Sequence, residues 1–230
     1  MKRRVLLAGL LLPSALRAQP VARPGYGPSA AAVTNWLRNS VASGAIAGSP
    51  GTQPVNWSPG TAAGLTVTIV GTGTESGLAY LEVRFAGTTN IDTFGYALDT
   101  TMGIPAAQNQ GWTLSAYLRL VAGSMTGVTT VLRLRSFTAT PTTLSTNDVT
   151  VTNPAPGPLS TQRVSQTWTI PDATAAFLRP TLVFNFAIGA AIDFTVRIGA
   201  PQAERASVAN AWVPTSGVAA SSGPRPIGGG

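Results

Sequence analysis

The chain has 230 residues, of which 44% are hydrophobic and only 10% are charged. This length suits one domain of ordinary size, whose polar surface must come mainly from Thr, Ser, Asn and Gln. The sequence contains no Cys and no His, which excludes disulfides, thiolate nucleophiles, imidazole bases and the usual zinc ligands.

Much of the formal net charge of +7 comes from the first eighteen residues. Lys2, Arg3, Arg4 and Arg17 are four of the fifteen basic residues, and without them eleven basic residues face eight acidic ones. The other arginines are scattered and form no basic run. A phosphate-binding surface needs clustered positive charge, so the sequence predicts no nucleic-acid partner.

Residues 1–18 have the three-part pattern of a secretory signal peptide. A basic start precedes the apolar run Val5 to Leu12, then Pro13 and the small residue Ala18 at the cleavage point. The apolar run is too short to span a bilayer, and no later apolar stretch is long enough either. The sequence therefore predicts a secreted or periplasmic bacterial protein, cleaved near Ala18, without membrane insertion.

Pro- and Gly-rich segments flank one continuous pattern. Residues 19–32 are predicted to be a flexible linker and residues 216–230 a flexible tail, so the domain is expected at residues 33–215. Short stretches between them alternate apolar and polar residues, at 65–70, 78–85, 112–121, 128–137, 162–170, 182–188 and 193–199. Such segments, separated by Gly, Pro, Asn and Thr, predict antiparallel strands. The predicted fold is all-β, an antiparallel β-sandwich of the jelly-roll type.

The glycine-rich stretch IVGTGTESG, from Ile69 to Gly77, superficially resembles a phosphate-binding loop. Such a loop needs a helix N-terminus directly behind it, whereas the strand pattern of residues 78–85 follows here. The stretch is therefore predicted to be a hairpin connection.

The carboxylates do not form an obvious catalytic pair. Only Glu82 and Asp193 fall on the polar side of predicted strands, where Arg84 and Arg197 share their faces, so salt bridges are expected. A glycosidase needs two carboxylates in one cleft, and a serine nucleophile would have no histidine base. The sequence predicts that the protein is not an enzyme.

Arginine, carboxylate, tyrosine and amide groups occupy the polar side of several predicted strands. Sugars are bound by such planar hydrogen-bonding groups together with aromatic faces. If these strands are neighbours, one sheet carries a ligand-binding face. The alternative is an ordinary solvated face whose charges pair across strands. The candidate ligand-binding residues are Tyr80, Glu82, Arg84, Tyr117, Arg119, Arg133, Arg135, Asn185 and Arg197.

Three stretches resemble the jelly-roll carbohydrate-binding modules related to cellulose-binding domains. Asn35 to Trp57 is similar to their opening, Gly111 to Val128 to a middle strand, and Pro-Gln-Ala-Glu followed by Trp212 and Val-Pro-Thr to their closing signature. The closing version is common in phage and prophage tail appendage proteins. The resemblance covers Thr34 to Thr215.

The sequence departs from the family pattern at two places. The family usually has an aromatic residue where Val41-Ala42 stands here, and more often Tyr than Trp at position 212. On this resemblance, Trp212 pins the returning chain against the edge of the sandwich.

The resemblance implies a galactose-binding-like sandwich that is exported, lectin-like and non-catalytic, and that binds a glycan or cell-surface polysaccharide. Some relatives hold a structural calcium. Few acidic residues lie near the ends of this chain, so the resemblance leaves a structural calcium as possible only. No other cofactor is expected. The alternative is a structural or assembly protein derived from a phage tail, whose polar face packs against other subunits of a homo-oligomer and binds no sugar.

Overall fold

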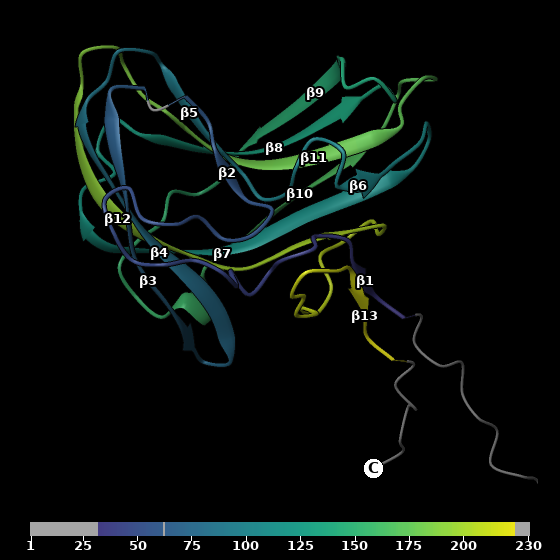
Figure 1. Ribbon diagram of the computed structural model, residues 1–230, viewed down its shortest axis with the longest axis horizontal. Helices are drawn as coiled ribbons and strands as arrows, with labels where there is room; N and C mark the ends of the chain where they lie inside the picture. The colour runs from purple at the N-terminus through teal and green to yellow at the C-terminus, as the bar shows by residue number, and fades with distance from the viewer. Residues whose placement is uncertain (1–31, 62, 224–230) are drawn as a thin grey trace, which may run out of the picture.

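The computed structural model describes residues 32–61 and 63–223 (Figure 1). The predicted signal peptide and nearly all of the predicted linker therefore lie outside the described residues, as does the end of the predicted tail. None of the described segments forms a helix with the length and hydrophobicity needed to cross a bilayer.

Two antiparallel sheets pack face to face as a jelly-roll β-sandwich, which confirms the predicted fold class (Figure 1). The five-stranded sheet has the order β10-β7-β12-β4-β3, and the six-stranded sheet the order β2-β5-β11-β8-β9, with β6 paired to β11. The first contains β3 (Leu65–Glu75), β4 (Leu78–Thr88), β7 (Gly111–Gly123), β10 (Arg163–Thr169) and β12 (Ala191–Glu204). The second contains β2 (Ser58–Pro59), β5 (Thr93–Ala97), β6 (Ile104–Pro105), β8 (Thr129–Phe137), β9 (Thr143–Thr150) and β11 (Phe177–Asn185).

The core lies between the sheets and is built from alternate residues of the strands. Phe85 of β4 and Phe194 of β12 pack against Phe94 of β5 and Phe184 of β11, with Phe85 5.2–5.3 Å from the other three ring centroids. All four rings are at most 1% exposed. Because strand side chains alternate between faces, this packing directs the intervening polar residues to the two outer faces.

All seven predicted strands are present, but several are longer than predicted and others were missed. β12 continues through the Pro-Gln-Ala-Glu stretch that was expected to follow it, because a bulge between Gly199 and Gln202 accommodates Ala200, at φ 45°, and Pro201. β5 and β9 were not predicted, since Thr, Asn and Gly residues weaken their hydrophobic pattern.

The glycine-rich stretch is a hairpin, as predicted. β3 and β4 pair through Glu75 and Leu78, and the two residues between them, Ser76 and Gly77, have φ values of 51° and 80°. Two consecutive positive φ values are characteristic of the type I′ turn, whose twist matches that of antiparallel strands. The segment therefore has no phosphate-binding geometry.

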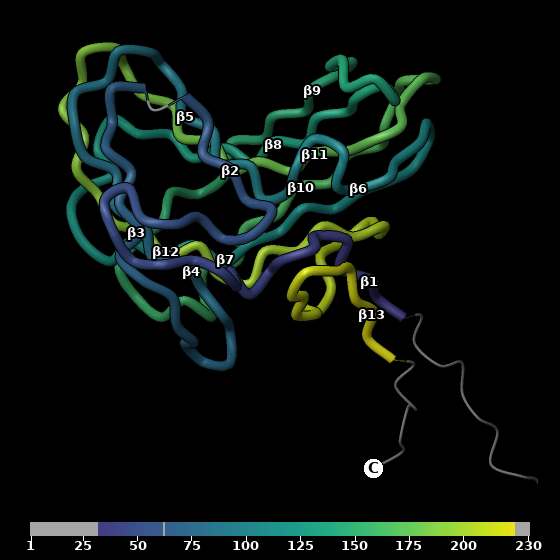
Figure 2. The backbone as a smooth tube through the Cα atoms, viewed as in Figure 1, coloured from purple at the N-terminus to yellow at the C-terminus, as the bar shows by residue number. Residues whose placement is uncertain are grey.

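The two ends of the described chain lie side by side (Figure 2). β1 (Thr34–Asn35) pairs with β13 (Ala220–Ser221), which belongs to the segment predicted to be a tail. Trp212 donates a hydrogen bond from its indole N–H to the hydroxyl of Ser40, 3.1 Å away. This contact ties the returning chain to the N-terminal segment.

The side-chain amide of Asn35 connects the N-terminal segment to β12 and to the returning chain. It donates to the carbonyls of Pro201 and Val213, and it accepts from the backbone N–H groups of Leu37 and Ala203. Asn35 is fully buried, so water cannot replace these bonds.

We predict that Asn35→Ala lowers the free energy of unfolding by about 3 kcal/mol, because it leaves buried backbone groups without partners. Urea unfolding followed by tryptophan fluorescence measures the change. Asn90→Ala, at an exposed position, is the matched control and is expected to change stability by less than about 0.5 kcal/mol. Equal effects of the two substitutions would contradict the role given to Asn35.

Candidate ligand-binding groove

The nine candidate ligand-binding residues lie on two different sheets rather than on one. Tyr80, Glu82, Arg84, Tyr117, Arg119 and Arg197 are on the outer face of the five-stranded sheet, on β4, β7 and β12. Arg133, Arg135 and Asn185 are on the outer face of the six-stranded sheet, on β8 and β11. The two groups are separated by the hydrophobic core, so they cannot contact one ligand together.

The arginines on the five-stranded sheet are neutralised by neighbouring carboxylates. Arg197 binds Glu82 at 2.8 Å and Glu75 at 2.6 Å, and Arg119 binds Glu75 at 2.8 Å. Arg84 makes two hydrogen bonds to Asp193, at 2.8 and 2.9 Å. Glu82 and Asp193 are thus in salt bridges, as the sequence predicted, with each bridge joining β4 to β12.

The tyrosines of this face are also covered by other side chains. The Arg197 guanidinium lies 4.2 Å from the centre of the Tyr80 ring, and that of Arg163 lies 5.4 Å from the centre of the Tyr117 ring. These cation–π contacts occupy the surfaces against which a sugar would stack. The outer face of the five-stranded sheet is therefore covered by ion pairs and cation–π contacts among its own residues.

The outer face of the six-stranded sheet contains a groove of about 320 Å³. Its strands curve in Figure 1, with β2 and β5 on one side of β11 and β9 on the other. Small residues of β5 and β11 and loop residues next to β2 face arginines from β8 and β11. The lining residues are Ser58, Pro59, Gly60, Thr61, Ile91, Thr93, Gly95, Ala97, Arg133, Arg135, Arg179 and Thr181.

Three arginines form the positively charged side of this groove. Arg133 makes two hydrogen bonds to Asp148 of β9, at 2.6 and 2.7 Å, and this contact raises its pKa. Arg135 donates to the hydroxyl of Thr146 at 3.1 Å. Burial lowers the pKa of Arg135, and the charge of Arg133 lowers it further.

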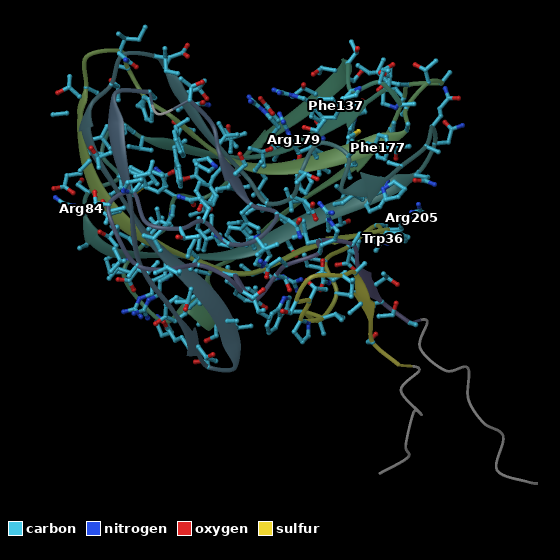
Figure 3. The ribbon with its side chains drawn as sticks, in the orientation of Figure 1. Trp36, Arg84, Phe137, Phe177, Arg179 and Arg205 are labelled. Carbon is cyan, nitrogen blue, oxygen red and sulfur yellow. The ribbon has the colours of Figure 1, made fainter. Side chains whose placement is uncertain are left out.

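Arg179 comes from β11, directly opposite Arg135 of β8. Its guanidinium donates to the hydroxyl of Thr101 at 3.0 Å and lies 5.1 Å from the centre of the Phe137 ring (Figure 3). Burial lowers its pKa, and the charges of Arg135 and then Arg133 lower it further. Figure 3 shows Arg179 and Phe137 together, far from Arg84 on the other sheet.

Sequence reasoning missed Arg179 and Thr181 because it began their strand at residue 182. Pro180 suggested a break, since a proline cannot donate to a sheet ladder. In the structure Pro180 lies where β5 has just ended, and its carbonyl still accepts a hydrogen bond from the backbone of Leu98. Asn185, which was predicted, lies at the far end of β11 and does not line the groove.

Most carboxylates of the described chain are engaged by other protein groups. Besides the residues above, Asp99 binds Arg38, Asp172 accepts from Ser136 and Ser145, and Glu204 accepts from Gln202 and Asn210. Within residues 32–61 and 63–223, no three His, Cys, Asp or Glu side chains gather as a metal site would require. These contacts give the carboxylates structural roles.

No family model and no curated protein matches the sequence, but solved structures are similar to it. An arabinose-bound α-L-arabinofuranosidase has a TM-score of 0.50 at 14% identity, over 75% of this chain and 26% of that one. A second match is the C-terminal family 22 carbohydrate-binding module of a Clostridium thermocellum xylanase. It has a TM-score of 0.39 at 17% identity, over 76% of this chain and 97% of the module. The enzymatically active domain of tailspike protein 4 of bacteriophage CBA120 has a TM-score of 0.44 at 13% sequence identity. The match covers 65% of this chain and 19% of the tailspike chain.

These similarities concern the fold. Carbohydrate-binding modules are among the matched structures. This chain spans about a quarter of the arabinofuranosidase and about a fifth of the tailspike chain. Sequence identities of 13–17% to these structures show a shared fold and do not identify a ligand of this chain.

Glu75 at the tip of the β3–β4 hairpin should make the fold sensitive to acid. The backbone N–H of Leu159 lowers the pKa of Glu75 most, and Arg197 and Arg119 lower it further, from 4.5 to about 2. Since the folded state favours the ionised form, its contribution to stability is present above pH 4.5 and is lost as pH falls towards about 2.

We predict that Glu75→Gln reduces the fall in unfolding free energy between pH 4.5 and about 2, because no carboxylate remains there to be protonated. Urea midpoints across this range measure the effect. Asp92→Asn, at an exposed position outside the salt bridges of the described residues, should leave the wild-type pH dependence unchanged. The same pH dependence in Glu75→Gln and wild type would contradict the prediction.

Proposed function

We propose that this protein is an exported, non-catalytic module that binds a glycan or polysaccharide through the groove on the outer face of the six-stranded sheet. The groove is the observation that carries the proposal. The groove has small residues, Gly95 and Ala97, at its base and arginines along one side. Arg135 and Arg179 form no salt bridge with other described residues, in contrast to the arginines of β4, β7 and β12 on the other sheet.

The groove retains hydrogen-bonding groups that the described protein residues do not use. A guanidinium has five N–H donors, and Arg135 and Arg179 each donate to one side-chain hydroxyl. Thr93 and Thr181 also line the groove, but their hydroxyl oxygens are buried, so the guanidinium groups supply the accessible donors. Sugar hydroxyls and ring oxygens are suitable partners for such groups.

Two features of the sequence support export and a binding role. The N-terminal pattern of residues 1–18 is that of a secretory signal, and the motifs between Thr34 and Thr215 resemble carbohydrate-binding modules. The groove also offers no pair of free carboxylates for glycoside hydrolysis, since Asp148 is held by two hydrogen bonds from Arg133.

We predict that Ala97→Trp weakens polysaccharide binding at least about tenfold, because the indole fills the groove above β5. Affinity electrophoresis through gels containing arabinoxylan, polygalacturonate or its methyl ester measures binding. Ala86→Trp is the matched control, since Ala86 is equally half-buried on the outer face of β4 in the other sheet. Its binding should equal that of the wild type.

The same samples distinguish the proposal from an assembly role. A monomer by light scattering that is retarded by at least one polysaccharide, and loses this retardation with Ala97→Trp, supports a binding module. A defined oligomer that no polysaccharide retards would overturn the proposal and would support the phage-tail-derived assembly protein. Retardation that only Ala86→Trp abolishes would move the site to the five-stranded sheet.

A further inference from the structure

The groove concentrates positive charge that the protein does not neutralise. Arg135 and Arg179 face each other directly across β8 and β11, and Arg133 is two residues from Arg135 on the same face. Like charges directly opposite one another in a sheet are destabilising. The one salt bridge that these three arginines form with described residues joins Arg133 to Asp148, so two guanidinium charges remain without a carboxylate partner.

The other sheet of the same protein provides an internal comparison. There the three arginines on β4, β7 and β12 are matched by three carboxylates, Glu75, Glu82 and Asp193. Arg163 of β10, on the same outer face, donates instead to the hydroxyl of Ser115 and the carbonyl of Asn210. Cross-strand neutralisation by carboxylates thus applies to the arginines at the centre of that sheet, on β4, β7 and β12. The uncompensated pair Arg135 and Arg179 departs from that arrangement, and it lies in a groove that is lined largely by small residues.

The surroundings of Arg179 and Arg135 make their charges effective towards an anion. Both side chains are partly buried. Partial burial weakens solvent screening and strengthens the attraction of a bound opposite charge. Guanidinium groups also bind carboxylates and sulfates through paired N–H donors.

The groove lacks the aromatic surface on which a neutral sugar ring would stack. Its apolar lining consists of Pro59, Ile91 and small residues, and the nearby Phe137 is 4% exposed beneath Arg179. Tyr80 and Tyr117, which were expected to supply aromatic faces, lie on the other sheet. Recognition in the groove must therefore depend more on charge and hydrogen bonding than on stacking.

We propose that the ligand of the groove is an acidic polysaccharide, whose carboxylate or sulfate groups bind between Arg135 and Arg179. This inference rests on the proposed glycan-binding function and specifies its ligand class. An acidic group would accept charge-assisted hydrogen bonds from both guanidinium groups and would offset the repulsion between them.

Polygalacturonate and its fully methyl-esterified form test the proposal, because they share a backbone and differ in charge. Isothermal titration calorimetry of the purified full chain should show at least about tenfold tighter binding of the charged polymer. Dextran sulfate and dextran form the second pair, which distinguishes sulfate from carboxylate recognition. A double-stranded DNA oligonucleotide tests general polyanion binding, and equal affinity for DNA would overturn the proposal.

Arg135→Gln and Arg179→Gln should each weaken binding of the preferred acidic polymer about tenfold. Arg84→Gln is the matched control, because it removes one positive charge from the outer face of the other sheet, where Arg84 is paired with Asp193. It should bind as the wild type does. Equal losses in all three variants would show nonspecific attraction by net charge and would overturn the proposal.

A stability measurement separates a binding defect from a folding defect. Removing one member of an uncompensated like-charge pair should leave the thermal unfolding midpoint of Arg135→Gln unchanged or raised. At the same concentration, the acidic polymer should raise the midpoint of the wild type more than that of this variant. A midpoint well below wild type, with no ligand present, would contradict the proposed repulsion between Arg135 and Arg179.

The outcomes also separate this inference from the proposed function. If the neutral polymers bind as tightly as the charged ones and Ala97→Trp abolishes their binding, the acidic specificity is wrong and the glycan-binding groove stands. If no polymer of either kind binds, the proposed function itself fails.

Discussion

Packing of phenylalanines between the two sheets is the constraint on which the rest of the structure depends. Phe85 and Phe194 on one sheet contact Phe94 and Phe184 on the other, and all four are buried. Because side chains alternate along a strand, burying these positions forces the charged residues between them outward. The same constraint divides the arginines between two outer faces, which lie on opposite sides of the core and cannot contact one ligand together.

The two outer faces differ in how their charges are balanced. On the five-stranded sheet, the β3–β4 hairpin brings Glu75 to both Arg119 and Arg197, and the resulting network joins three strands. On the six-stranded sheet, Asp148 binds Arg133, while the partners of Arg135 and Arg179 among residues 32–61 and 63–223 are hydroxyl groups. An unbalanced, partly buried charge costs stability unless something offsets it. This difference makes the groove the candidate site and suggests the chemistry of its ligand.

The ends of the domain are held by buried polar groups rather than by apolar packing alone. Asn35 binds β12 and the returning chain through four hydrogen bonds, and Gln202 accepts one from the backbone of Val213. Such bonds require specific partners, so they position a segment more narrowly than hydrophobic contact does. They attach the ends of the chain to the part of β12 that continues past Pro201, which sequence periodicity did not predict.

The sequence by itself determined the fold class, seven strands and their inward faces, because alternation of apolar and polar residues is a local property. It also identified the hairpin at Ser76-Gly77 and nine charged and polar residues that lie on the two outer faces. Only the tertiary structure decided which of these groups share a face, since strand order depends on contacts between residues far apart in the chain. Arg179 and Arg135 are 44 residues apart, yet β11 pairs with β8 and places them opposite each other. No local pattern contains that pairing.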